Sequence, residues 1–224
     1  MKNSSVNPPR SMVIDVIGEG KTDVGKGRQA TPPTQGVIPI LLHKLCGVPE
    51  GMLVRRFPLP FIIGKGLHKK VLLAKRRAHD SGAAGAVFVV DSEGSEKDLE
   101  SKRTQLQKGR AQTLPGFPMA VGVAHPCIEA WLLADPRAIR RACNLESEPS
   151  VPADPEQLPV PRHDGLNNPK RALAYAAGLQ RGLSAQEKDR IAAEINDIDL
   201  LRQRCPLGFA PFADEVQHRI RPLF

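Results

Sequence analysis

Two short apolar runs that each lead into acidic residues constrain the fold of this chain more than any other feature. The first run covers residues 12–18 and is followed by Glu19, and the second covers residues 86–90 and is followed by Asp91 and Glu93. Runs rich in Val and Ile are typical of strands buried on both faces of a parallel sheet. Because such sheets bind ligands at the carboxyl ends of their strands, we expect the three carboxylates to meet at one edge.

The three acids Glu19, Asp91 and Glu93 indicate the kind of ligand that this edge would take. Carboxylates gathered in one cleft repel one another, and a bound cation relieves the repulsion. Oxygen-only ligand sets of this kind suit Mg²⁺ and Mn²⁺. The sequence therefore predicts a site for Mg²⁺ (or Mn²⁺) at the carboxyl edge of the sheet.

Hydrophobic periodicity predicts how the first part of the chain is organised. Ser95 and Asp98 have the spacing of a capping box, which predicts a helix that begins after Ser95 and runs to about residue 109. Strand and helix patterns alternate, and this order predicts an α/β fold with a mostly parallel sheet of about four strands flanked by helices. The other expected elements are strands at 12–18, 54–62, 86–91 and 118–124, and helices at 38–45, 66–80 and from Pro126.

The C-terminal part of the chain has a different pattern. Residues 145–169 are rich in Pro, Asp and Glu and predict a long surface connection. Helical periodicity then follows to the end of the chain, which predicts a helical extension packed on one flank of the sheet. The expected helices lie at about 169–181, 184–203 and 212–220.

Composition favours a polyanionic partner. The 224 residues carry a formal net charge of +8, and a basic protein of this kind suits nucleic acid. Aromatic residues make up only 4%, so we expect contacts to the phosphate backbone rather than base stacking. The four cysteines include no C-x-x-C pair, which argues against a zinc ribbon. No apolar run has the length of a membrane span, so we expect a cytoplasmic protein with reduced thiols and no membrane contact.

The turn after the first apolar run allows a second interpretation. Gly20, Lys21 and Thr22 match the end of a phosphate-binding P-loop, but that motif also requires a glycine where this chain has Asp15. A P-loop-like nucleotide-binding ATPase or switch is therefore the first alternative. A non-catalytic nucleic-acid-binding module, in which Glu93 has spoiled the metal site, is the second.

The acidic motifs resemble those of the Toprim superfamily, the metal-dependent domain of topoisomerases, bacterial primases and related nucleases. That family carries a Glu after its first strand and a D-x-D after its third, and this chain has Glu19 and the Asp91-Ser92-Glu93 triplet. Along most of its length the chain also resembles an uncharacterised bacterial Toprim-like family. The shared motifs are E-G-x-T-[DE], P-x-x-E-x-W-L-x-A-D and N-P-K-R, here residues 19–23, 126–135 and 168–171.

The resemblance implies a fold, an activity and a set of roles. Asp91 and Glu93 would hold the metal, and Glu19 would act as general acid/base or share the metal, in a nuclease that acts on DNA or RNA. We expect DNA to be the favoured substrate. Glu93 stands where the family has a second Asp, so its carboxylate reaches about one methylene further. The family is related to overcoming-lysogenisation-defect nucleases, which implies an ATPase partner and a role in phage defence.

The resemblance also sharpens the domain division. We expect a flexible N-terminal arm over 1–11 and a Toprim-like catalytic domain over 12–143. A helical C-terminal extension over 144–224 would pack on the same core.

Residues after the fourth expected strand have both structural and functional interpretations. Glu129 falls in the first turn of a helix, where an acid is favoured by the helix dipole, or it points back and joins a second metal site. Asp135 precedes Pro136 and is expected to cap the next helix. His125 is a hydrogen-bonded structural histidine or touches a phosphate or metal. Trp131 lies among apolar residues and is expected in the core.

Basic residues form the expected nucleic-acid-binding surface. Lys21 follows the proposed catalytic Glu19 and would contact phosphate there. The basic amphipathic helix expected at 66–80 supplies several further lysines and arginines, and Lys170 and Arg171 lie at the start of a helix in the C-terminal part. A solvated helix face is the structural alternative for the basic helix. Asp23, at the end of the first motif, is a further possible site residue. The candidates are Lys21, Lys65, Lys69, Lys70, Arg76, Arg77, Lys170 and Arg171, with a second basic cluster at Arg103, Lys108 and Arg110.

Overall fold

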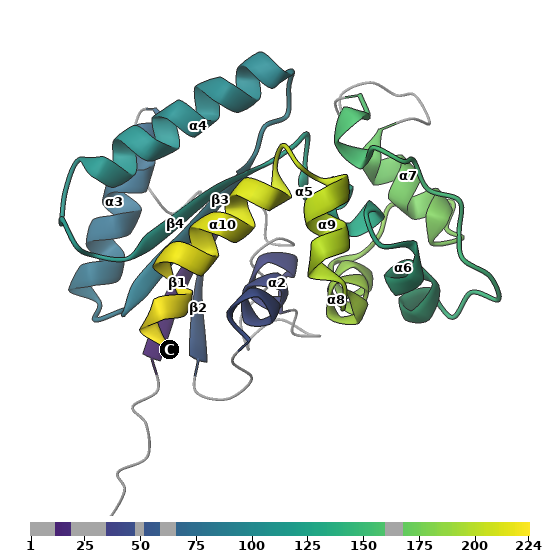
Figure 1. The fold of residues 1–224 in the computed structure, drawn as a ribbon, viewed down its shortest axis with the longest axis horizontal. Coiled ribbons are helices and arrows are strands. Elements are labelled where there is room, and N and C mark those ends of the chain that lie inside the picture. Colours follow the sequence, from purple (N-terminus) through teal and green to yellow (C-terminus); the bar gives the residue numbers. More distant parts are fainter. Residues whose placement is uncertain (1–11, 19–34, 48–51, 59–65, 160–167) are drawn as a thin grey trace, which may run out of the picture.

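A parallel sheet forms the centre of the protein (Figure 1). The computed structural model describes residues 12–18, 35–47, 52–58, 66–159 and 168–224. The sheet of these residues has the spatial order β2-β1-β3-β4, and every neighbouring pair is parallel. The expected α/β fold with a mostly parallel sheet of about four strands is confirmed. The strands are β1 (Met12–Gly18), β2 (Met52–Pro58), β3 (Gly85–Asp91) and β4 (Met119–Ala124).

Helices follow the strands along the chain, and the second half of the protein is helical, as expected. The helices of the described residues are α2 (Val37–Cys46), α3 (Leu67–Asp80), α4 (Glu96–Ala111), α5 (Ile128–Leu133), α6 (Pro136–Cys143), α7 (Pro169–Ala176), α8 (Ala185–Glu194), α9 (Ile198–Arg204) and α10 (Phe209–Arg219), with the 3-10 turns η2 (Pro155–Gln157) and η3 (Arg221–Leu223).

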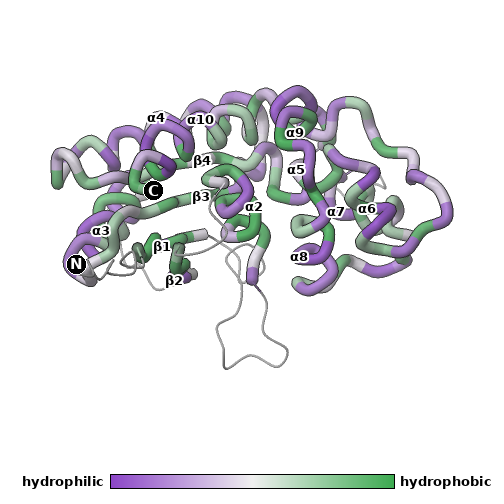
Figure 2. The backbone as a smooth tube through the Cα atoms, turned by 60° about the horizontal axis from the view of Figure 1, so that its bottom comes forward, coloured by the Kyte–Doolittle hydropathy of each residue, from purple (hydrophilic) through white to green (hydrophobic). Residues whose placement is uncertain are grey.

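Alternate residues of each strand pack on opposite faces of the sheet. Phe88 and Val90 of β3 join one apolar cluster with side chains of α3 and α4. Val87 and Val89 join the other cluster, which includes side chains of α2, α5 and α10. Burial on both faces explains why residues 86–90 of β3 and the whole of β4 are continuous apolar runs, which colour as largely hydrophobic in Figure 2.

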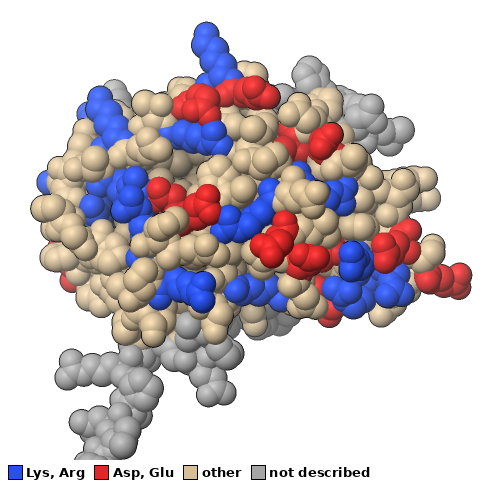
Figure 3. All heavy atoms as spheres, in the orientation of Figure 1, with Lys and Arg blue, Asp and Glu red and all other residues tan. Residues whose placement is uncertain are grey.

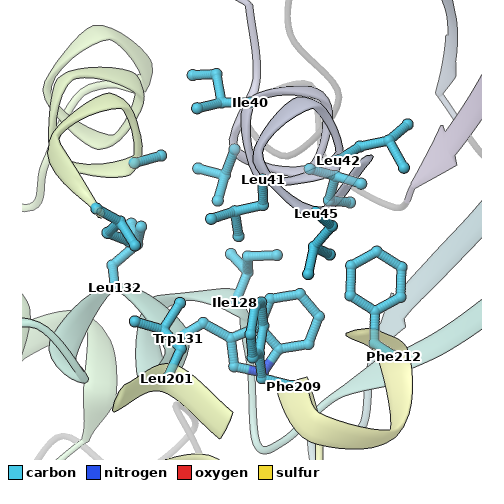
Figure 4. Close-up of a cluster of buried hydrophobic side chains, with 14 of the residues drawn as sticks. Ile40, Leu41, Leu42, Leu45, Ile128, Trp131, Leu132, Leu201, Phe209 and Phe212 are labelled. Carbon is cyan, nitrogen blue, oxygen red and sulfur yellow. The ribbon is translucent and has the colours of Figure 1, made fainter. Parts of the chain in front are cut away.

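The larger cluster contains the aromatic centre of the core (Figure 4). Trp131 of α5 is fully buried, as the sequence predicted. It stacks on Phe212 with ring centroids 5.4 Å apart and meets Phe209 edge-on at 5.3 Å. Both phenylalanines belong to α10, so this contact joins the C-terminal helices to the segment that follows the sheet.

Register sets which strand ends lie together. Gly18, the last residue of β1, pairs with Val89, and Asp91 at the end of β3 pairs with Ala124. The carboxyl ends of β1, β3 and β4 therefore lie at one edge of the sheet. Since β1 and β3 are direct neighbours, their ends are separated by one strand spacing, about 4.8 Å.

Several sequence-based boundaries are wrong. The helix expected over 184–203 is two helices, α8 and α9, because the Asp197 side chain accepts from Leu200 N at 2.9 Å and starts a new helix. Pro126 does not open α5; it lies before the N-cap residue Cys127. The second strand begins at Met52 rather than at 54, and residues 59–62 of the expected strand lie outside the described part of the chain.

The segment expected as a surface connection over 145–169 is partly anchored in the interior. Glu156, in η2, is buried, and its carboxylate accepts hydrogen bonds from the backbone N–H groups of Leu207 (2.6 Å) and Gly208 (2.7 Å). It thereby satisfies donors at the start of α10 that the helix itself leaves unpaired. None of the helices in the described part of the chain is long and apolar enough to cross a membrane.

Candidate functional site at the carboxyl edge

The turn after β3 is fixed to the turn after β4 by hydrogen bonds. Ser92 N donates to Ala124 O (2.8 Å), and Glu93 N donates to Pro126 O (2.9 Å). The buried Ser92 hydroxyl lies 2.8 Å from Nδ1 of His125. Ser92 thus faces inward and holds the turn, which leaves its acidic neighbours Asp91 and Glu93 at the edge of the sheet.

Glu93 has a backbone conformation that side chains rarely adopt. Its φ is 50°, in the left-handed region, where residues other than glycine are uncommon. Such a conformation persists when surrounding contacts impose it, and it is enriched at functional sites. Here the imposing contact is the hydrogen bond to Pro126, so the β4 turn decides where the Glu93 carboxylate lies.

Asp91 is oriented from two directions. Its Oδ1 accepts a hydrogen bond from Ile128 N at the start of α5 (3.1 Å). Its backbone carbonyl accepts from Nζ of Lys102, a residue of α4 (2.6 Å). The carboxylate is only partly buried, so it is both positioned and accessible.

Glu129 forms a buried ion pair with a residue from the C-terminal helices. Its Oε1 lies 2.5 Å from Nζ of Lys188 in α8, and the two side chains are 4% and 11% exposed. Burial opposes ionisation of Glu129, but the charges of Lys188 and Lys170 outweigh that effect and hold its pKa below the usual range. The Lys188 ammonium therefore lies against the Glu129 carboxylate, where the sequence analysis considered a second metal ion.

Lys170 links this ion pair to the acidic turn. Partial desolvation opposes its charge, but the negative charges of Glu129, Asp91 and Glu93 prevail and raise its pKa. Cys127, between the same acids, is fully buried, and burial followed by the charges of Glu129 and Asp91 raises its pKa well above the usual range. Lys170 therefore lies within electrostatic range of both Glu129 and the acidic turn.

His125 and Asp135 have structural contacts. His125 is buried, and burial lowers its pKa, which favours the neutral form of the ring that meets Ser92. The Asp135 carboxylate accepts from Ala138 N (3.0 Å) and caps α6, which confirms the predicted cap.

The basic candidates do not lie together. Lys69 and Lys70 are in the first turn of α3, whereas Arg76 and Arg77 lie near its end. That end reaches the amino edge of the sheet, because Ala84 N, four residues after α3, donates to Val13 O at the start of β1. On the face seen in Figure 3, acidic and basic side chains are interspersed.

The second basic cluster has structural partners. Arg110 pairs with Glu215 of α10, and Arg103 donates to Leu207 O and pairs with Glu100. Lys75 of the basic helix is buried and donates to the carbonyls of Arg110 (2.8 Å) and Thr113 (2.6 Å). These contacts hold α3, α4 and α10 together. Arg171 is exposed in the first turn of α7, where its N–H donates to the Asn168 side chain (3.0 Å).

Several candidates lie outside the described residues: Glu19, Lys21, Asp23 and Lys65, together with the alternative motif Gly20-Lys21-Thr22. Among the residues that are described, no three His, Cys, Asp or Glu side chains gather closely enough to hold a metal ion. Asp91 and Glu93 alone therefore do not form a complete centre.

Sequence reasoning missed Lys188 and Lys102. Lys188 precedes Ile191 and Ala192 by three and four residues, so it lies on the buried face of α8. A lysine on an apolar helix face signals a buried partner, but the partner is 59 positions away, and local spacing does not reveal it.

Comparisons with protein-family models, with curated proteins and with solved structures found no match to this chain. A parallel sheet of order β2-β1-β3-β4 is consistent with Toprim-like and Rossmann-like folds alike. The chain is thus an α/β protein with an all-parallel sheet flanked by helices and a helical C-terminal region.

Proposed function

We propose that this protein is a Toprim-type, Mg²⁺- or Mn²⁺-dependent nuclease that hydrolyses phosphodiester bonds of nucleic acid, with DNA as the favoured substrate. The observation that carries the proposal is the register of β1 and β3. Gly18 is opposite Val89, so the chain leaves β1 toward Glu19 one strand away from the end of β3 at Asp91. Acids from two neighbouring strand ends are the ligands that a divalent ion requires.

The chemistry of the described donors fits a divalent cation. Asp91, Glu93 and Glu129 supply three carboxylates, and Lys170 and Lys188 supply two ammonium groups, a net charge of −1. One bound dication makes the cluster positive, which attracts a phosphodiester. All proposed ligands are hard oxygen donors, as Mg²⁺ and Mn²⁺ prefer.

The proposed roles follow from these positions. Asp91 and Glu93 hold the metal with Glu19, and Glu19 moves a proton to or from the reacting oxygen. The bound metal would neutralise charge on the scissile phosphate and lower the pKa of water. Lys170 binds a phosphate oxygen beside these acids, and Lys21 and the first-turn residues Lys69 and Lys70 contact the backbone further along.

Glu129 is left out of the proposed metal set. Its Oε1 is held by the Lys188 ammonium at 2.5 Å, and a second dication bound to the same carboxylate would be repelled by that charge. The geometry thus favours one metal at the Asp91 edge.

Metal binding and cleavage test the proposal separately. Asp91→Asn keeps an oxygen for Ile128 N but removes the charge, whereas Asp80→Asn removes an exposed charge at the end of α3 and is the matched control. We expect calorimetry to show Mn²⁺ binding to wild type and to Asp80→Asn but not to Asp91→Asn. Cleavage of plasmid, linear DNA and RNA should fall about 100-fold or more in Asp91→Asn.

The outcomes separate the alternatives. Identical Mn²⁺ titrations of wild type and Asp91→Asn would overturn the metal site and favour a non-catalytic module. Tight Mg²⁺-dependent binding of labelled ATP that Lys21→Ala abolishes would instead favour the P-loop interpretation. Co-purification tests the proposed ATPase partner.

A further inference from the structure

A small cavity lies where α5, α7 and α8 meet, next to the acidic edge. Its volume is about 100 Å³, and its lining combines two lysines, one carboxylate and an apolar wall. Cavities that hold nucleosides or drug-sized ligands are several times larger. This one accommodates a single compact group. Its lining residues are Glu129, Lys170, Leu173, Gly182, Leu183 and Lys188.

Among the described residues that line this cavity, one buried oxygen lacks a strong hydrogen-bond donor. Oε1 of Glu129 is bound by Lys188, whereas the buried Oε2 meets no donor with hydrogen-bond geometry within the described part of the chain. The thiol of Cys127, a weak donor, also acts on this carboxylate and helps to lower its pKa. Unpaired buried polar atoms are rare because each one costs free energy, so this one indicates a ligand or water that the protein accommodates. A fitting ligand must donate a hydrogen bond to the carboxylate and accept from ammonium groups.

We infer that this cavity binds the terminal phosphate monoester of a nucleic-acid strand, an assignment that rests on the proposed nuclease function for its biological meaning. The anionic oxygens would accept from Lys170 and Lys188, and a P–OH group would donate to Oε2 of Glu129. The monoanion of a monoester carries such a hydrogen and forms readily because the second pKa is about 6, whereas an internal phosphodiester has none.

The position of the cavity suits an end of a strand. Besides its three charged residues, the cavity is lined by Leu173, Gly182 and Leu183, which carry no polar side chain that would bind further phosphates of a strand. Lys170 lines the cavity and also lies within electrostatic range of Asp91 and Glu93. A strand whose terminal phosphate is held here would therefore present a nearby bond to the acidic edge.

The experiment measures binding without cleavage, in buffer that contains a metal chelator. The probes are inorganic phosphate and one dinucleotide in three forms: 5′-phosphorylated, 3′-phosphorylated and unphosphorylated. Lys170→Gln removes an exposed lysine of the cavity. Arg221→Gln removes an exposed cation of η3, near the start of β3 at the opposite edge of the sheet, and is the control. Calorimetry gives the affinity of each protein for each probe.

We expect inorganic phosphate and at least one phosphorylated dinucleotide to bind wild type and Arg221→Gln with equal affinity. Lys170→Gln should bind them about tenfold more weakly, the effect of one charge-assisted hydrogen bond. The phosphorylated form that binds identifies the strand end. Equal affinities for phosphorylated and unphosphorylated dinucleotides, equal affinities of all three proteins, or no binding of any phosphate would each overturn the inference. Phosphate binding as expected in a protein that cleaves no nucleic acid would leave this site standing and refute only the nuclease.

Discussion

Breaking the ion pair between Lys188 and Glu129 should destabilise the protein strongly. Lys188→Met keeps the apolar stem but removes the ammonium from a carboxylate that is 4% exposed. At 2.5 Å and an effective dielectric constant of about 20, the attraction is about 7 kcal/mol, and desolvation offsets most of it. Leaving one buried charge uncompensated costs about 3 to 5 kcal/mol. Because Lys170 also acts on Glu129, we expect the lower end, about 3 kcal/mol.

Urea unfolding followed by fluorescence measures this loss. Trp131 is the only tryptophan and is fully buried two residues after Glu129, so its emission reports unfolding of this region. Lys108→Met, on the exposed face of α4, should change the free energy of unfolding by less than about 0.5 kcal/mol. The double variant Glu129→Leu/Lys188→Met removes both charges and should recover most of the loss. A loss below about 1 kcal/mol for Lys188→Met, or a double variant equal to the sum of the singles, would refute the reasoning.

Two further predictions concern stability. Burial raises the pKa of Glu156 from 4.5 to about 7, although the hydrogen bonds from the N–H groups of Leu207 and Gly208 act to lower it. Between pH 4.5 and 7 the folded protein therefore keeps a proton on Glu156 that the unfolded chain releases. The contribution of Glu156 to the free energy of unfolding is fully present below pH 4.5 and is lost as the pH rises through about 7. Relative to Glu156→Gln, we expect wild type to lose about 3 kcal/mol over this range. Urea unfolding measures the free energy of both proteins at each pH, and parallel pH profiles would contradict this prediction. Gly109→Ala puts a Cβ 2.4 Å from the His68 carbonyl oxygen and forces α3 and α4 apart. We expect thermal unfolding to show that Gly109→Ala lowers the free energy of unfolding by about 2 kcal/mol, despite the better helix propensity of alanine. The control Gly182→Ala has open space around its Cβ and should leave the stability unchanged. A Gly109→Ala protein as stable as wild type would show that α3 and α4 adjust freely.

Short sequence patterns correctly predicted the strands, helices and caps that are determined by residues close together in the chain. The strand at 86–91 is a run buried on both faces, and its observed bounds are Gly85–Asp91. The capping box of α4 is present, with Asp98 accepting from Ser95 N at 2.8 Å, because its residues are three positions apart and need no tertiary contact. The cap of α6 by Asp135 has the same origin. In contrast, Pro126 was misassigned because a proline before an N-cap and a proline at the first helical position have the same local sequence.

Electrostatic partners could not be predicted in this way. Arg103 and Arg110 belong to a cluster that looks like a binding surface in sequence, yet Arg110 pairs with Glu215 and Arg103 donates to Leu207 O, more than 100 positions away. Glu156 was expected on the surface but lies under the first turn of α10. A charge has no periodicity that reveals whether its partner is water or a distant side chain.

The sequence by itself determined the fold class and the acids at the strand ends, since apolar runs and the residues after them follow from the chain alone. The strand order decided that β1 and β3 are neighbours, and hydrogen bonds from the β4 turn decided where Glu93 lies. Tertiary packing also brought Lys188 onto Glu129, which lines a cavity and keeps one buried carboxylate oxygen without a hydrogen bond among the described residues. Backbone preferences act over a few residues, whereas burial and charge act through space, so only the folded chain could bring these groups together.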